Sequence, residues 1–161
     1  MRLREMRTAC PVLFWGPKVP VNEVPFLGNH REKPDPHVRR RELRERAFRF
    51  SCGIVIFSRK LMPRGAVQKH IAVQLVKAST SIGANLEEAT AGQSKADFIA
   101  PNVRSLKESR ESRYWLRLIA ATEPDLKPDV QPFLGEANEL VAIMTALVRT
   151  ARSNPNRGGA V

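Results

Sequence analysis

Four glutamates are the residues of this chain whose type and spacing best suit catalysis. They occur as two close pairs, Glu87 with Glu88 and Glu108 with Glu111. Carboxylates that face one another inside a helical bundle are typical of di-iron sites, which also need a histidine three residues after a glutamate. None of the three histidines has this spacing. We therefore predict no metal and no cofactor, and expect these acids to pair with arginine or to cap backbone groups.

Other catalytic patterns are absent from the sequence. It has no glycine-rich phosphate loop, no nucleophile elbow and no cysteine–histidine pair. Cys10 and Cys52 are the two cysteines, and they form no C-x-x-C pair that would hold zinc or suggest a disulfide framework. We therefore predict that the protein is not an enzyme.

Positive charge is the strongest compositional feature of the chain. The formal net charge is +11 over 161 residues. Such a charge attracts phosphate-rich polymers through contacts that do not depend on base sequence and weaken steeply with salt. On a helical wheel, Arg110, Arg113 and Arg117 lie within about 60° of one another. The candidate nucleic-acid-binding residues are Arg59, Lys60, Arg64, Lys69, Lys77, Lys107, Arg110, Arg113 and Arg117.

The positive charge is also consistent with a surface that serves solubility alone. Membrane-surface binding needs a helix with a free apolar face, and the apolar faces here are needed for packing, so we expect no membrane partner. No stretch approaches the ~18 apolar residues of a membrane span, and the run ACPVLFWG is too short for a signal peptide. We therefore expect a cytoplasmic protein.

Apolar and small residues recur at spacings of three and four in four segments, which is the pattern of helices packed in a bundle. The four seams are Ala47, Phe50, Ile54, Phe57 and Leu61; Ile71, Leu75, Ala78, Ile82, Leu86 and Ala89; Ser105, Ser109, Ser112, Leu116 and Ile119; and Phe133, Ala137, Leu140, Met144 and Leu147. They predict an all-α fold, an up-down-up-down four-helix bundle over residues 39–152. Gly83 predicts a closely approaching neighbour, because glycine costs a helix roughly 1 kcal/mol.

Breaking and capping residues predict the ends of the first two helices. We expect the first helix to begin near Arg40 and to end at Pro63 and Gly65. The second helix should run over residues 66–91, with Gly92 as its C-cap.

The third and fourth helices are separated by a proline-punctuated segment. Ser94 and Asp97 form a variant capping box, which predicts a third helix over residues 95–121. Pro101 lies inside it and removes one hydrogen bond, so we expect a kink or a break there. The segment TEPDLKPDVQP, residues 122–132, predicts a connection before the fourth helix.

The two ends of the chain lack periodicity. Residues 1–38 hold half of the twelve prolines, which is typical of a disordered leader. Residues 153–161, ending in SNPNRGGAV, predict a disordered tail.

Four motifs occur in order between residues 42 and 152. They are QLVKASTSIGANLEEA over residues 74–89, DF over 97–98, ESRESRYWL over 108–116 and EANEL over 136–140. Together they resemble the four-helix bundle family called 23S rRNA intervening sequence proteins. We expect the residues at its signature positions to pack between helices and between subunits. They are Ser81, Asn85, Glu88, Glu108, Glu111, Tyr114 and Trp115.

The resemblance implies an assembly and partners. The family implies a homopentamer, and it includes the accessory variability determinant of diversity-generating retroelements, which implies nucleic acid and a reverse transcriptase as partners. We therefore predict a non-enzymatic homopentameric bundle that binds RNA or DNA through a basic surface, as an accessory to RNA or reverse-transcriptase complexes. The alternative is a protein–protein scaffold with no nucleic-acid role. Pairing of Arg110, Arg113 and Arg117 with Glu136 and Glu139 would favour the scaffold.

Overall fold

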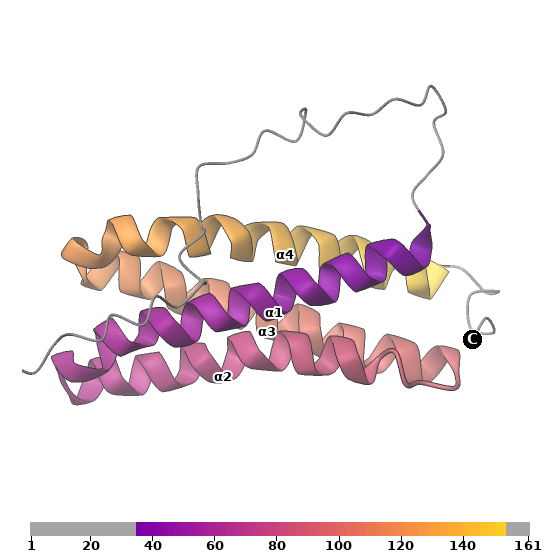
Figure 1. Ribbon diagram of the computed structural model, residues 1–161, viewed down its shortest axis with the longest axis horizontal. Helices are drawn as coiled ribbons and strands as arrows, with labels where there is room; N and C mark the ends of the chain where they lie inside the picture. Colours follow the sequence, from indigo (N-terminus) through magenta and orange to yellow (C-terminus); the bar gives the residue numbers. More distant parts are fainter. Residues whose placement is uncertain (1–34, 154–161) are drawn as a thin grey trace, which may run out of the picture. The chain divides into compact units, whose positions relative to one another are not determined.

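A computed structural model describes residues 35–153, and within them the chain forms four long helices and no strand (Figure 1). The helices are α1 (Pro36–Leu61), α2 (Ala66–Glu88), α3 (Lys95–Thr122) and α4 (Lys127–Ser153), with two short 3₁₀ turns, η2 (Met62–Arg64) and η3 (Pro124–Leu126). The predicted all-α, four-helix fold is confirmed. The predicted leader, up to residue 34, and the tail from residue 154 lie outside the described residues.

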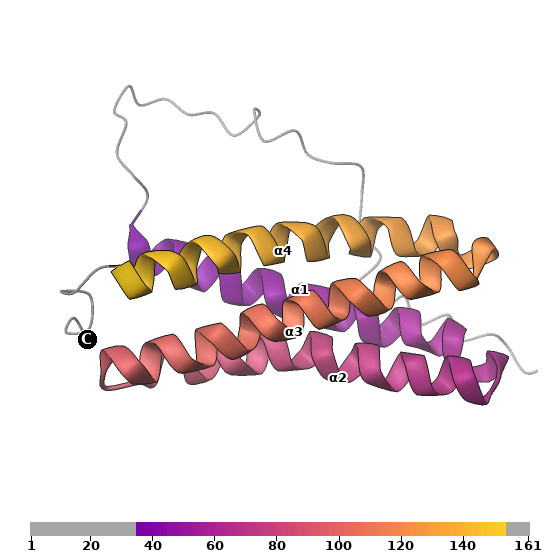
Figure 2. The same ribbon diagram turned by 180° about the vertical axis from the view of Figure 1, so that it is seen from behind.

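Helices that follow one another in the chain lie side by side and run in opposite directions (Figures 1 and 2). Each helix packs against the next, and α4 also packs against α1. Short connections favour this arrangement, because a helix that leaves a tight turn can reach only its neighbour. The result is the predicted up-down-up-down order.

The core consists of the predicted seams. Every seam residue of α1 is buried, and so are the five of α3, including three serines. On α2 and α4 the seam residues are buried except Ile71, Phe133 and Leu147, which are half-buried and pack against the core. Apart from that of Ser112, the serine hydroxyls in the core bond to backbone carbonyls of the same or the adjacent helix: Ser105 donates to Ile82 O at 2.9 Å, and Ser51 donates to Ser79 O at 2.8 Å.

Helix α1 begins at Pro36, about one turn before the predicted start at Arg40, so that prediction was wrong. Asp35 is the N-cap, and its carboxylate accepts a hydrogen bond from His37 N at 2.8 Å. Proline suits the first helical position, because its missing N–H has no partner there anyway. The Asp–Pro pair is therefore a start signal for the helix and no part of the leader.

Helix α2 ends at Glu88, so the prediction of residue 91 with a Gly92 C-cap was wrong. Ala89 is the C-cap, and the turn closes with bonds from Thr90 N to Glu87 O and from Ala91 N to Glu88 O. The glycine serves close approach instead, because a Cβ on Gly92 would lie 2.8 Å from that of Asp97.

Helix α3 is continuous through Pro101, so of the kink or break predicted there the break was wrong (Figure 2). The predicted capping box is present: Asp97 N donates to Ser94 Oγ, and Ser94 N donates to the Asp97 carboxylate, both at 3.1 Å. Proline leaves the carbonyl four residues earlier without its helical donor. That carbonyl belongs to Asp97, which is exposed to solvent. The side chain of Asn102 also donates to Phe98 O at 2.6 Å.

Helix α4 begins at Lys127, inside the segment that the sequence predicted as a connection. Pro128 lies in the first turn, where a helix needs no N–H donor, and Pro132 lies in the second turn. Leu126 of η3, just before this start, and Val130 of α4 are both buried. The prediction of a connection was wrong because Pro128 occupies the first turn of a helix, where proline is tolerated, and Pro132 lies inside the helix without ending it.

Candidate nucleic-acid interface

Helix α3 has two flanks with opposite electrostatic character. One flank contacts α2: Arg104 bonds to Asn85 Oδ1 at 2.8 Å and to Glu88 Oε1 at 2.5 Å. At 100° per residue, the two glutamates of α3 lie on this flank. Arg110, Arg113 and Arg117 lie on the opposite flank, on the side of α4.

The three arginines of that flank are available to a ligand. Arg110 and Arg117 are exposed and Arg113 is half-buried. Within residues 35–153, no ion pair joins any of them to an acid. Glu136 instead accepts two hydrogen bonds from Arg46 of α1, at 2.5 and 2.9 Å. The pairing that would favour a scaffold is therefore not formed with Glu136.

Helix α4 adds two cations that sequence reasoning missed. Arg149 and Arg152 lie on the side of α4 turned toward α3, and both are exposed. The acids of α4 lie toward α1, where Asp129 pairs with Lys60 and Glu136 with Arg46. Charge summed over the last 39 residues hid this separation, since four cations and five acids nearly cancel.

The α3 flank that lies toward α4 and the α4 flank that lies toward α3 together form what we call the arginine face. It comprises Arg110, Arg113, Arg117, Arg149 and Arg152. No aspartate or glutamate of α3 or α4 lies on either flank at helical spacing. A surface that concentrates one sign of charge, without counter-charges, attracts polyanions strongly.

The structure does not bring the other predicted cations to this face. Lys60 pairs with Asp129 at 2.7 Å, and Arg64 pairs with Glu123 and Asp125 next to η3. The pKa of Asp125 is lowered by its hydrogen bond to Arg64. The other four predicted cations are exposed: Arg59 on α1, Lys69 and Lys77 on α2, and Lys107 on α3. Of these, only Lys107 lies near the arginine face, along its outer edge.

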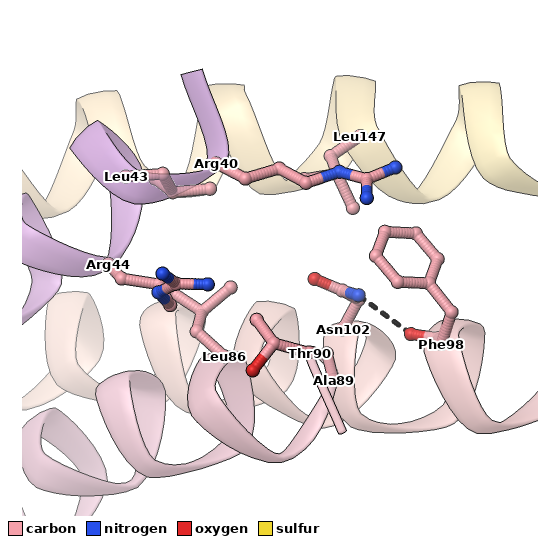
Figure 3. Close-up of a pocket in the computed structure, with 9 residues that line it drawn as sticks. All are labelled: Arg40, Leu43, Arg44, Leu86, Ala89, Thr90, Phe98, Asn102 and Leu147. Carbon is pink, nitrogen blue, oxygen red and sulfur yellow. Dashed lines mark hydrogen bonds between the residues drawn. The ribbon is translucent and has the colours of Figure 1, made fainter. Parts of the chain in front are cut away.

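A small cavity of about 20 Å³ lies where the start of α1, the end of α2 and the start of α3 meet α4 (Figure 3). Asn102 is almost fully buried here, and its amide oxygen points away from Phe98. The guanidinium of Arg40 lies 4.9 Å from the ring centre of Phe98, which is a cation–π contact. The volume suits a single water-sized group. The lining residues are Arg40, Leu43, Arg44, Leu86, Ala89, Thr90, Phe98, Asn102 and Leu147.

Comparison with protein families identifies the fold family. A family model described as 23S rRNA-intervening sequence protein matches residues 39–146, which is well over half of the chain. The chain belongs to this family. The resemblance that the motifs indicated is therefore confirmed.

A solved member of the S23 ribosomal protein family, from Bacteroides thetaiotaomicron VPI-5482, has the same fold as this intervening sequence protein. That protein is described as having unknown function. The two chains are 28% identical, with a TM-score of 0.62, and the match covers 69% of this chain and 98% of the other. No curated protein matches the chain.

The signature residues of this intervening sequence protein gather on the flank that joins α2 and α3. Asn85 donates to Ser81 O at 2.8 Å. Both Asn85 and Glu88 accept hydrogen bonds from Arg104. Further along α3, the indole of Trp115 donates to Glu111 Oε1 at 3.2 Å. The bonds of Arg104 to Asn85 and Glu88 stabilise the α2–α3 pair.

Tyr114 and Glu108 complete the signature set. The rings of Tyr114 and Trp115 form a T-shaped pair with centroids 5.2 Å apart, although the Tyr114 side chain is 56% exposed. No group of three or more His, Cys, Asp or Glu among residues 35–153 is arranged to hold a metal ion. None of the described helices is long and apolar enough to cross a membrane.

Glu108 is the signature residue with a perturbed carboxyl. Burial raises its pKa, the charge of Glu111 raises it further, and the charge of Lys77 lowers it in part. A carboxyl whose pKa is raised by folding binds its proton more tightly in the folded state. Ionised Glu108 therefore lowers the free energy of unfolding at neutral pH.

The variant Glu108→Gln is expected to unfold at a higher denaturant concentration than the wild type at pH 7. The gain should shrink as the pH falls through the raised pKa of Glu108 and should be lost below about 4.3, the ordinary glutamate value, because Glu108 is then neutral in both states. Urea unfolding of the variant and the wild type at pH 7, and again at a pH below about 4.3, measures the gain at both pH values. Glu42→Gln, an exposed site on α1, is the control and should change little. An equal gain at both pH values would show that charge is not the cause.

Proposed function

We propose that this intervening sequence protein is a non-enzymatic nucleic-acid-binding protein that contacts phosphates through the arginine face. The observation that carries the proposal is the set of five arginines on adjoining flanks of α3 and α4, without an acid among them. Arginine donates to phosphate oxygens in a bidentate geometry and keeps its charge at all physiological pH values. A location in the cytoplasm and an accessory role in RNA or reverse-transcriptase complexes belong to the same proposal.

We also propose that the chain acts as a homo-oligomer, with the pentamer that the family resemblance implies. Phe48, Val55 and Met62 follow one another at heptad spacing along α1 and into η2, and each is at least 38% exposed, Phe48 to 63%. Such an exposed stripe, which residues 35–153 do not cover, favours a contact with a second copy. Gly83 of α2 supports this. A Cβ there would meet nothing within 4 Å, so the close neighbour predicted for this glycine is not within the described part of the chain.

Binding to RNA and DNA at two salt concentrations tests the proposal. Light scattering first gives the mass of the oligomer, and fluorescence anisotropy then gives the dissociation constants. With five phosphate contacts per chain, the logarithm of the binding constant should fall with the logarithm of salt concentration at a slope of about −4.

Two results would contradict parts of the proposal. If a stable oligomer binds neither nucleic acid at low salt, the arginine face has another use and the protein–protein scaffold gains support. If light scattering shows a monomer at all concentrations, the stripe that starts at Phe48 is not an interface between copies.

A further inference from the structure

We propose that the arginine face binds double-helical nucleic acid and binds single strands more weakly. This inference rests on the proposed function and adds the class of ligand. It draws on three observations: where the arginines lie along the bundle, which side chains lie between them, and how rigid the supporting elements are.

The five arginines form two clusters along the face. Arg110, Arg113 and Arg117 are one turn apart on α3 and span about 10 Å of helix axis at 1.5 Å per residue. Arg149 and Arg152 lie in the last turns of α4, near the end of the bundle where α3 begins (Figure 2). Because α3 and α4 are antiparallel and closely joined through η3, the clusters are about 20 Å apart along the axis.

The surface between the clusters lacks the row of rings that holds single strands. Proteins bind single strands by stacking successive bases on aromatic rings, which contributes about 1–3 kcal/mol for each base. Tyr114, at the outer edge of the α3 flank, is the nearest aromatic residue at helical spacing, and its ring makes a T-shaped contact with that of Trp115. The indole of Trp115 is itself engaged with Glu111 on the α2 flank. The face therefore offers many contacts to phosphates and no series of platforms for unstacked bases.

The charge density of the ligand then decides between the two forms. Phosphate contacts release counterions, and the salt slope is about −0.9 for each contact on a duplex but about −0.7 on a single strand. With five contacts, the difference amounts to about one logarithmic unit at 0.1 M salt. Electrostatics alone should therefore favour a duplex about tenfold.

Rigidity acts in the same direction. Both clusters lie on long helices that pack against each other through buried seams. Two fixed clusters match a ligand whose phosphates are also fixed, whereas a single strand must lose conformational freedom to reach both.

The experiment compares one sequence in two forms. A duplex of about 20 base pairs and its separate, unstructured strand, each as RNA and as DNA, are titrated with the full chain at about 0.1 M and 0.2 M salt. We expect the duplex to bind about tenfold more tightly at the lower concentration and to show the steeper salt slope.

Variants of the second cluster locate the contact. Arg149→Ala/Arg152→Ala should make the salt slope of duplex binding shallower by about 1.8 units, which is the contribution of two phosphate contacts. The matched control is Arg44→Ala/Arg49→Ala, which removes the same charge from α1, where these residues pair with Glu87 and Glu45. It should leave the slope nearly unchanged.

The possible failures are distinguishable. If single strands bind as tightly as the duplex, or if both double variants lower the slope equally, the inference is wrong while nucleic-acid binding stands. If neither form binds to the assembled protein, the proposed function fails together with the inference.

Discussion

Replacing the first arginine cluster should nearly abolish binding: Arg110→Ala/Arg113→Ala/Arg117→Ala is expected to lose two to three orders of magnitude in affinity for a duplex. Each phosphate contact contributes about 0.9 logarithmic units at 0.1 M salt, so three contacts contribute roughly 500-fold. The slope against salt should fall by about three units. Anisotropy titrations at several salt concentrations measure both quantities.

The loss must come from the face and not from unfolding. Arg110 and Arg117 are exposed and none of the three has an ion pair among the described residues, so each substitution should change the free energy of unfolding by about 0.5 kcal/mol or less. Arg44→Ala/Arg49→Ala again provides the control for net charge. Equal loss per charge in both variants would show that binding follows total charge and uses no defined surface.

Ser112→Ala is expected to raise the free energy of unfolding by about 1–2 kcal/mol. The Ser112 hydroxyl is fully buried, and within the described part of the chain it has no hydrogen-bond partner. An unpaired buried hydroxyl costs roughly 1–3 kcal/mol. Alanine fills nearly the same space, removes this cost and has the higher helix propensity.

The neighbouring serines of α3 provide matched controls. Ser105 donates to Ile82 O at 2.9 Å, which ties α3 to α2, and Ser109 donates to Ser105 O at 2.8 Å. Ser105→Ala should therefore lower the stability by about 1 kcal/mol, and Ser109→Ala should lie between the two. Urea denaturation followed by circular dichroism measures the series. A loss of stability in Ser112→Ala would mean that its hydroxyl bonds to a group in the assembled protein.

The core could be predicted from the sequence because it depends on periodicity. Phe50, Ile82 and Leu140 are buried because they recur on one face of a helix, and this is visible without any tertiary contact. Helix ends were less well predicted, because proline has opposite meanings at different positions. Pro36 and Pro128 stand where a helix begins, whereas Pro101 and Pro132 lie inside helices that continue through them.

The candidate site was harder to predict because it depends on neighbours that are distant in the sequence. The pairing of Arg64 with Asp125 joins residues 61 positions apart, and no local pattern announces it. Arg149 and Arg152 were missed for a related reason. Helix α4 has almost no net charge. Only its packing in the bundle shows that its acids lie toward α1 while these two arginines lie toward α3.

The packing of each helix against its sequence neighbour has a consequence for how the chain folds. Contacts between consecutive helices are short-range in sequence, and proteins dominated by such contacts fold in microseconds to milliseconds. The α1–α4 seam is different, because its Arg46–Glu136 pair joins residues 90 positions apart. Docking of the consecutive helices is therefore expected to precede closure of α4 onto α1, which makes this seam the last to form and the first to open.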